Sequence, residues 1–298
     1  MGDENRLFRQ FEANLRMTPA TVSAVRNRYH AITRRINVDF WGTSSDTDHS
    51  WYAGSYGRGT AISTSDIDIL VELPPGEYNN ACARSLFGGN GPSELLQKVK
   101  RSLSATYPQT KLRGDGQVVV AEFTDGVRFE IVPVFRAETP GTYRYPDTHD
   151  GGSWPTMNPR RELEVFNGLS KDHPGGLKKF CRMLRAWNNK QGQYFSGQAL
   201  DAMAFEYWEQ SLWADNLPYL YFDWHTRDFF EYWKNEFARG GGVVAPGTRR
   251  RIDAFAAPPM VDLLALYADI AKTAIDATDT CQATEFWRTI FDDRFPKS

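Results

Sequence analysis

The chain has 298 residues, of which 41% are hydrophobic and 24% are charged, and its formal net charge is -2. These values are typical of a folded globular protein and exclude wholesale disorder. The nearly neutral charge argues against a protein that grips long nucleic acid, because such proteins carry a basic excess.

The first half of the chain predicts a mixed α+β lobe. Residues 4–41 have a helical pattern in which Thr18 and Pro19 make a good helix start. Asp125 and Gly126 separate two β-prone runs, which indicates a hairpin. The expected elements are the helix at 4–41, a strand at 51–53, a glycine turn at 54–60, a strand at 66–73 closed by residues 74–76, a helix at 93–107, and the hairpin strands 118–123 and 127–135.

The second half predicts a helical lobe. A long loop rich in Gly, Pro, Tyr and Asp is expected over 139–158. The helices are expected at 159–170, 174–191, 196–215, 226–238, 258–277 and 283–293. We therefore expect a core domain over 1–150, a helical domain over 151–298, and a ligand in the cleft between them.

Three sparse cysteines, Cys82, Cys181 and Cys281, give neither a disulfide framework nor the spacing of a zinc site. No signal peptide is visible, and no apolar run approaches the roughly 20 residues that span a membrane. These features predict a cytoplasmic protein with free thiols and no membrane partner.

A glycine-rich segment, Gly54 to Thr60, lies just before Asp66 and Asp68. Glycines let a backbone approach phosphates, and the hydroxyls of Ser55 and Thr60 could add donors. Side chains alternate along a strand, so Asp66 and Asp68 share a face and could bind magnesium together. Taken separately, the alternatives are a plain tight turn and two surface carboxylates.

A third carboxylate is available on the second hairpin strand. Glu130 lies between Phe129 and Ile131, which would face the core, so Glu130 points to the opposite face. It joins the two aspartates if the two strands are neighbours. The alternative is an ordinary glutamate that faces solvent.

This combination resembles the DNA polymerase β-type nucleotidyltransferase superfamily. Within this superfamily, less specific features resemble the bacterial cGAS/DncV-like nucleotidyltransferases, or CD-NTases. The shared features are Gly54-Ser55, Gly59-Thr60, Ser65 to Ile69, Glu130 before Ile131-Val132-Pro133, Trp154, Asn158-Pro159, Leu184 to Trp187, and Ser196. They run from about residue 50 to residue 210.

The resemblance implies a polymerase β-like core, a C-terminal helical lobe and a site with two Mg²⁺ ions, for which Mn²⁺ could substitute. Asp66 and Asp68 would bind both ions, and Glu130 would bind the ion that activates the attacking ribose hydroxyl. Many members carry Asp at the position of Glu130, and Glu122 and Asp125 lie nearby as alternatives.

The resemblance also implies residues that hold the donor nucleotide, since family members bind its triphosphate with a basic helix residue and a serine. Without the resemblance, the basic helix residues could be a solvated surface face. The nucleotide-binding candidates are Gly54, Ser55, Thr60, Lys178, Arg182, Arg185 and Ser196.

The implied function is synthesis of a cyclic di- or trinucleotide second messenger from ATP, GTP or other triphosphates, in anti-phage (CBASS-type) signalling. The implied partners are the nucleotides, a downstream effector that senses the product, and accessory regulators. The alternatives are a related transferase that acts on an RNA end or a small molecule, and a nucleotide sensor without catalysis.

Overall fold

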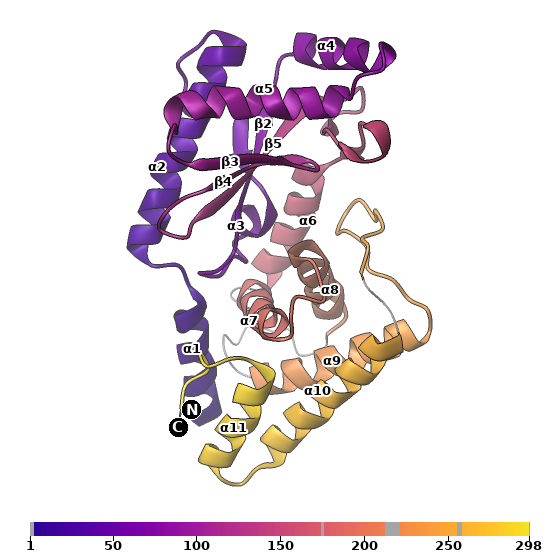
Figure 1. The fold of residues 1–298 in the computed structure, drawn as a ribbon. Helices are drawn as coiled ribbons and strands as arrows, with labels where there is room; N and C mark the ends of the chain where they lie inside the picture. The colour runs from indigo at the N-terminus through magenta and orange to yellow at the C-terminus, as the bar shows by residue number, and fades with distance from the viewer. Residues whose placement is uncertain (1–2, 174–175, 212–220, 255–257, 298) are drawn as a thin grey trace. The chain divides into compact units, whose positions relative to one another are not determined.

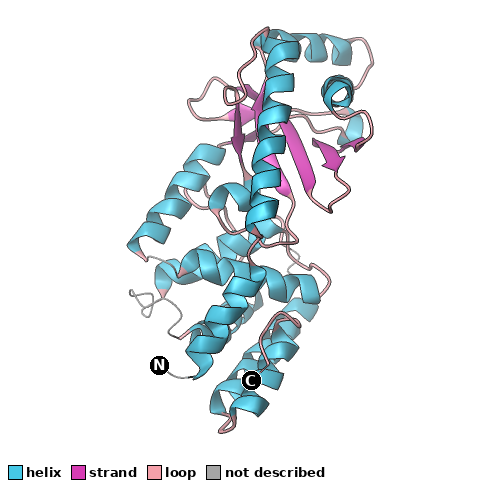
Figure 2. Ribbon diagram, turned by 90° about the vertical axis from the view of Figure 1, so that its left-hand side faces the viewer, coloured by secondary structure: helices cyan, strands magenta, loops and turns pink. Residues whose placement is uncertain are grey.

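The structure is a computed structural model that describes residues 3–173, 176–211, 221–254 and 258–297 (Figure 1). The chain divides into two compact units. Residues 17–57 and 64–161 form the first, which we call the sheet unit. The described residues of 1–16, 58–63 and 162–298 form the second, which we call the helical unit. Figure 2 shows that all strands are gathered in one of the two units.

The division of the chain differs in detail from the expected boundary near residue 150. The crossing into the helical unit lies between residues 161 and 162. The first helix, α1 (Asp3–Leu15), also groups with the helical unit. The same holds for residues 58–63, which include the end of the glycine-rich segment.

The sheet unit is built on a mixed sheet with the strand order β1-β2-β5-β4-β3. Strand β2 pairs in parallel with β5, and β4 pairs antiparallel with β5 as the expected hairpin. The short strands β6 and β7 extend the sheet beside β5. The strands are β1 (Ser50–Tyr52), β2 (Ile67–Glu72), β3 (Lys111–Asp115), β4 (Val118–Glu122), β5 (Arg128–Arg136), β6 (Tyr143–Arg144) and β7 (Thr156–Met157).

One face of this sheet is covered by α2 (Pro19–Ile36) and α5 (Gly91–Thr106), which Figure 1 shows against the strands. The apolar side chains of both helices and the odd-numbered side chains of β2 and β5 make one core cluster. Side chains alternate along each strand, so Asp66, Asp68 and Glu130 lie on the opposite face. The two helices thus leave the acidic face of the sheet uncovered.

Several elements of the sheet unit differ from the expectation. The glycine segment is a short helix, α3 (Gly54–Arg58), instead of a turn. The prolines follow the end of β2 as expected, but they also open an unexpected helix, α4 (Pro75–Leu86), because Pro at the first helical position needs no N–H donor. The exposed strand β3 and the short strands β6 and β7 were not expected.

The N-terminal helical stretch is interrupted at Thr18, as the expected helix start implies. The Thr18 Oγ1 accepts a hydrogen bond of 3.1 Å from the N–H of Thr21. The apolar residues Val25, Tyr29, Ile32 and Ile36 of α2 are buried, whereas Val22 is 41% exposed. A π-helical turn over Asn37–Trp41 ends this stretch.

The helical unit packs its helices around a core rich in aromatic side chains, among them Trp187, Trp233 and Trp287. The expected helices are all present, although the ends expected at 174 and 215 lie outside the described residues. Their bounds are α6 (Pro159–Asp172), α7 (Leu177–Lys190), α8 (Gly197–Gln210), α9 (Phe222–Ala238), α10 (Pro258–Asp276) and α11 (Thr280–Ile290). Among the described helices, none is long and apolar enough to cross a membrane.

Candidate active site

Asp68 and Glu130 lie side by side on adjacent strands. They are register partners in the parallel pairing of β2 with β5. The neighbouring strands that the sequence analysis required are therefore present. Asp66 lies two residues before Asp68, on the same face and just before β2.

These carboxylates are crowded. Burial raises the pKa of Glu130 to about 7, and the negative charge of Asp68 adds to this effect. Burial also raises the pKa of Asp66 above its usual value. Both shifts show that ionised carboxylates on this face need positive charge beside them.

The other two carboxylates considered from the sequence are engaged elsewhere. Glu122 lies 2.7 Å from the Nζ of Lys111, and Asp125 lies 2.9 Å from Arg28. Of the three candidates for the third acid, Glu130 is the register partner of Asp68.

Arg128 supplies positive charge within the cluster, and the sequence analysis missed it. Its Nη1 donates to the Oδ2 of Asp66 at 2.9 Å, and its Nη2 donates to the Oε1 of Glu130 at 2.6 Å. Arg128 lies two residues before Glu130 on the same strand, so the alternation that identified Glu130 also indicates Arg128.

The glycine helix is fitted closely against Asp68. Gly54 has a φ of +53°, and a Cβ added there would lie 2.5 Å from the Cγ and 2.9 Å from the Cβ of Asp68. Glycine is therefore required at this position both for its backbone conformation and for its missing side chain. The neighbouring Ser55 is buried.

Two basic residues of α7 lie beside Gly59. Arg182 donates to the carbonyl oxygen of Gly59 at 2.6 Å and also contacts Glu12. A Cβ on Gly59 would lie 3.7 Å from the Nζ of Lys178. Burial and the nearby Arg182 lower the pKa of Lys178, so a negative charge beside Lys178 would stabilise its charged form.

Arg185, by contrast, is buried in an ion cluster around Asp201 of α8. The Oδ2 of Asp201 lies 2.7 Å from Arg185, Arg58 and the hydroxyl of Thr60. Burial by itself would raise the pKa of Asp201, but the two guanidinium groups lower it. Asp201 was not among the predicted site residues, although an acid within the apolar first half of α8 is a sequence signal for such a partner.

Ser196 is the N-cap of α8, where its side chain accepts a hydrogen bond of 3.1 Å from the N–H of Ala199. Arg185 reaches the same helix start and donates to the carbonyl oxygen of Gly197 at 2.9 Å. The structure thus brings Thr60, Arg185 and Ser196 together at the start of α8. Arg182 and Lys178 lie one and two turns earlier on α7, beside Gly59.

The family model described as the Second Messenger Oligonucleotide or Dinucleotide Synthetase domain matches residues 1–169, more than half of the chain. The chain belongs to this family. It is therefore a nucleotidyltransferase that makes a signalling oligonucleotide, as the resemblance implied.

Relatives of this synthetase agree with the assignment. Over 260 residues it is 22% identical to a cyclic AMP-AMP-AMP synthase from an Acinetobacter species, covering 84% of this chain and 73% of the relative. It also matches Escherichia coli CdnC, solved in a complex with HORMA-deltaN, with a TM-score of 0.74, 14% identity, and coverage of 99% of this chain and 98% of that one.

A further solved structure with the same fold is the Bradyrhizobium diazoefficiens CD-NTase CdnG in complex with GTP. Its TM-score is 0.72 at 14% identity, and the match covers 99% of the synthetase and 96% of CdnG. The expected α+β fold, with a polymerase β-like core and a helical lobe, is confirmed.

Enzymes of this family depend on a divalent metal, and the carboxylates of the sheet unit have the chemistry to bind one. They are hard oxygen donors on one face of adjacent strands, and their raised pKa values show a need for positive charge. Within the described part of the chain, however, no group of three His, Cys, Asp or Glu side chains is arranged to hold a metal ion. Two of these carboxylates, Asp66 and Glu130, are instead paired with the guanidinium of Arg128.

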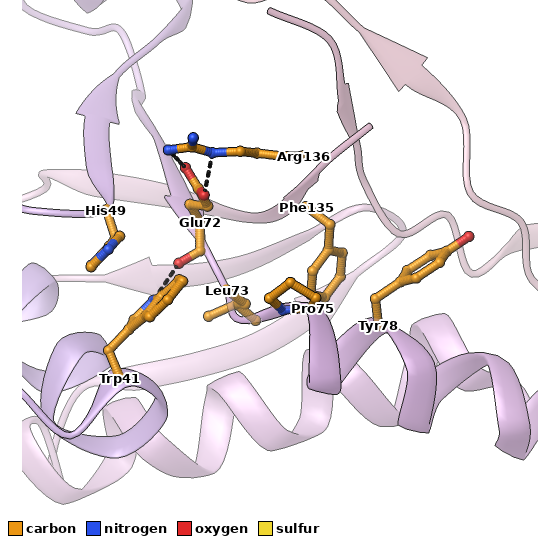
Figure 3. Close-up of a pocket in the computed structure, with 8 residues that line it drawn as sticks. All are labelled: Trp41, His49, Glu72, Leu73, Pro75, Tyr78, Phe135 and Arg136. Atoms are coloured by element: carbon orange, nitrogen blue, oxygen red, sulfur yellow. Dashed lines mark hydrogen bonds and ion pairs between the residues drawn. The ribbon is translucent and has the colours of Figure 1, made fainter. Parts of the chain in front are cut away.

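The synthetase also has a cavity of about 370 Å³ in the sheet unit (Figure 3). Asp66, Asp68 and Glu130, the acidic cluster, are not among the residues that line it. Trp41 stacks on His49, with the ring centroids 3.9 Å apart, and its Nε1 donates to the carbonyl oxygen of Glu72. Glu72 in turn forms an ion pair with Arg136, which Figure 3 shows at the edge of the cavity. The cavity and the acidic cluster use different parts of β2.

Proposed function

We propose that this synthetase joins nucleoside triphosphates into a cyclic di- or trinucleotide and releases pyrophosphate. The observation that carries the proposal is the pairing of Asp68 with Glu130, on the face that also carries Asp66. A protein that only binds a nucleotide has no need of three carboxylates on one face. The similarity to a cyclic AMP-AMP-AMP synthase favours ATP among the substrates.

We assign Asp66, Asp68 and Glu130 to two divalent ions, Mg²⁺ or Mn²⁺. When bound, such ions supply an activated hydroxyl and positive charge against the phosphates. Gly54 leaves room for the side chain of Asp68, which a Cβ at position 54 would overlap. The backbone of Gly54 and the hydroxyl of Ser55 are assigned to the donor nucleotide.

In the transfer itself, a ribose hydroxyl oxygen of the acceptor attacks the α-phosphorus of the donor. The new P–O bond forms as the bond between the α-phosphorus and the bridging oxygen breaks, and pyrophosphate leaves. The hydroxyl proton passes to the carboxylate of Glu130, which lies beside Asp68 on the acidic face of the sheet. A second transfer within the linear product closes the ring.

The donor triphosphate needs positive charge, which we assign to Lys178 and Arg182. Both lie beside Gly59, and Lys178 is a partly buried cation with a lowered pKa. Thr60, Arg185 and Ser196 support this segment through Asp201 and the start of α8. We thus propose that Asp66, Asp68 and Glu130 of the sheet unit carry catalysis.

We further propose that the product serves anti-phage signalling in the cytoplasm by switching on a separate effector protein. The described cysteines are free thiols, which fits a reducing compartment. CdnC, which shares this fold, was solved with a HORMA partner, and this supports an accessory regulator here.

The test is incubation with the four ribonucleoside triphosphates and Mg²⁺, comparing the native enzyme with an Asp66→Asn, Asp68→Asn double variant. The native enzyme should release pyrophosphate, and the double variant should lose at least about 10³-fold in rate, because it removes two metal ligands. The matched control is the Glu122→Gln, Asp125→Asn double variant, which neutralises two nearby carboxylates outside the cluster. Equal rates for the two double variants would refute the assignment.

A further inference from the structure

Arg128 occupies a position that the proposed metal role leaves unexplained. Its guanidinium joins Asp66 and Glu130, with N–O distances of 2.9 and 2.6 Å. These are two of the three carboxylates assigned above to divalent ions. A guanidinium that forks across two carboxylates is a strong and directional contact.

The contact is built into the sheet. Arg128 and Glu130 lie two residues apart on β5, and Asp66 precedes β2, the parallel neighbour of β5. The side chain of Arg128 is 32% exposed. Its Nε is buried and finds no hydrogen-bond partner among the described residues. The two terminal nitrogens are thus held by carboxylates while the third donor is left unsatisfied, which makes the arrangement incompletely stabilised.

The contact also competes with a metal for the same atoms. Asp66 Oδ2 and Glu130 Oε1 accept hydrogen bonds from Arg128, so neither can bind a cation at full strength while that contact persists. A guanidinium near the cluster also repels a divalent ion. Arg128 therefore compensates the negative charge when no metal is bound and opposes its arrival.

We propose that Arg128 is an internal counter-ion that holds Asp66 and Glu130 in the metal-free enzyme and must give them up for divalent metal to bind. It is a positioning residue that sets the metal concentration at which the site assembles. The inference rests on the proposed metal role of the three carboxylates. It differs from that role in predicting that removal of a residue strengthens metal binding.

The experiment measures Mn²⁺ binding to the nucleotide-free, full-length enzyme by electron paramagnetic resonance. The Arg128→Gln variant should bind Mn²⁺ about tenfold more tightly than the native enzyme, because a competing positive charge is gone. The matched control is Arg113→Gln, which removes an arginine of β3 that pairs with Asp115 and Glu122. This control should bind Mn²⁺ within about twofold of the native enzyme.

A melting experiment provides a second readout that does not depend on activity. In EDTA, Arg128→Gln should have a lower melting temperature than the native enzyme. When Mn²⁺ is added, its melting temperature should rise by more than that of the native enzyme. If the glutamine variant does not fold without metal, Arg128→Lys is tested instead. Lysine keeps the positive charge but cannot donate to both carboxylates in the way that the guanidinium does. The lysine variant should bind Mn²⁺ about threefold more tightly than the native enzyme.

Two results would overturn the inference. Unchanged or weaker Mn²⁺ binding by the Arg128 variants, with normal binding by the native enzyme, would make Arg128 a residue that orients the metal ligands, and the proposed function would stand. Absence of Mn²⁺ binding from the native enzyme would remove the metal role of the carboxylates, and the inference would fall with it.

Discussion

Gly54→Ala is the most informative substitution in the glycine segment, because Gly54 touches the candidate metal ligand Asp68. The new Cβ would lie 2.5 Å from the Cγ and 2.9 Å from the Cβ of Asp68. Rotation of the carboxylate relieves the first contact but not the second, since the Cβ of Asp68 is fixed by strand β2. The substitution must therefore shift either the helix start or the strand.

The magnitude has two parts. A φ of +53° costs an alanine about 1 kcal/mol relative to glycine, and the overpacking costs about 1–3 kcal/mol more. The effect on turnover should be larger, because displacing a catalytic group by roughly 1 Å costs about 10²-fold. The expected loss in kcat is thus about 10²-fold or more, with a modest loss in stability.

Gly42→Ala is the matched control. Gly42 has a similar φ of +68°, and no described atom lies within 4 Å of an added Cβ. In both variants the strained backbone at alanine should lower the free energy of unfolding by about 1 kcal/mol, which urea denaturation measures. Only Gly54→Ala should also lose activity and Mn²⁺ affinity. If Gly54→Ala made product as fast as Gly42→Ala, the close contact between glycine helix and metal ligand would have no catalytic role.

Two further predictions concern buried charges. The pKa of Glu130 is about 7 in the folded state and near 4.5 in the unfolded chain. Between these pH values the folded state keeps a proton that the unfolded chain has released, so the stability of the fold decreases as the pH rises. Over this pH window, the free energy of unfolding of the metal-free native enzyme should fall by about 2 kcal/mol, allowing for solvent screening, whereas that of Glu130→Gln should not fall in this way. Urea denaturation at several pH values measures both, and parallel pH profiles for the two proteins would contradict the prediction. Asp201→Asn should lower the free energy of unfolding by about 3–5 kcal/mol, because the buried Arg185 and the largely buried Arg58 would lose their carboxylate partner. The exposed control Asp269→Asn should change it little. A loss below about 1 kcal/mol for Asp201→Asn would mean that the ion cluster is replaceable.

The sequence was sufficient to predict the acidic strands, because their signals are local. Alternation placed Ile67, Ile69 and Val71 in the core and the aspartates on the opposite face, and the buried side chains agree. The turn at Asp125 and Gly126 predicted the hairpin, which the structure contains. The parallel pairing of β2 with β5 is a long-range contact, so the sequence could state it only as a condition for Glu130.

Other features depend on tertiary context. Glycines disfavour helices, yet residues 54–58 are helical where the chain packs on Tyr52 and Asp68. The prolines at 74 and 75 do follow the end of β2, but the sequence did not show that Pro75 would also start a helix. The positions of Lys178, Arg182 and Arg185 in the sequence predict that they share one face of a helix. They could not reveal that Arg185 would be buried in an ion pair with Asp201.

The central claim is that this synthetase closes a ring of nucleotides. The most direct measurement is mass spectrometry of the products formed from the four ribonucleoside triphosphates with Mg²⁺ or Mn²⁺, before and after phosphatase treatment. The account predicts a di- or trinucleotide whose mass lacks one water relative to the linear form and which phosphatase leaves intact. Linear products that lose their terminal phosphates to phosphatase, or nucleotides attached to added RNA, would contradict it.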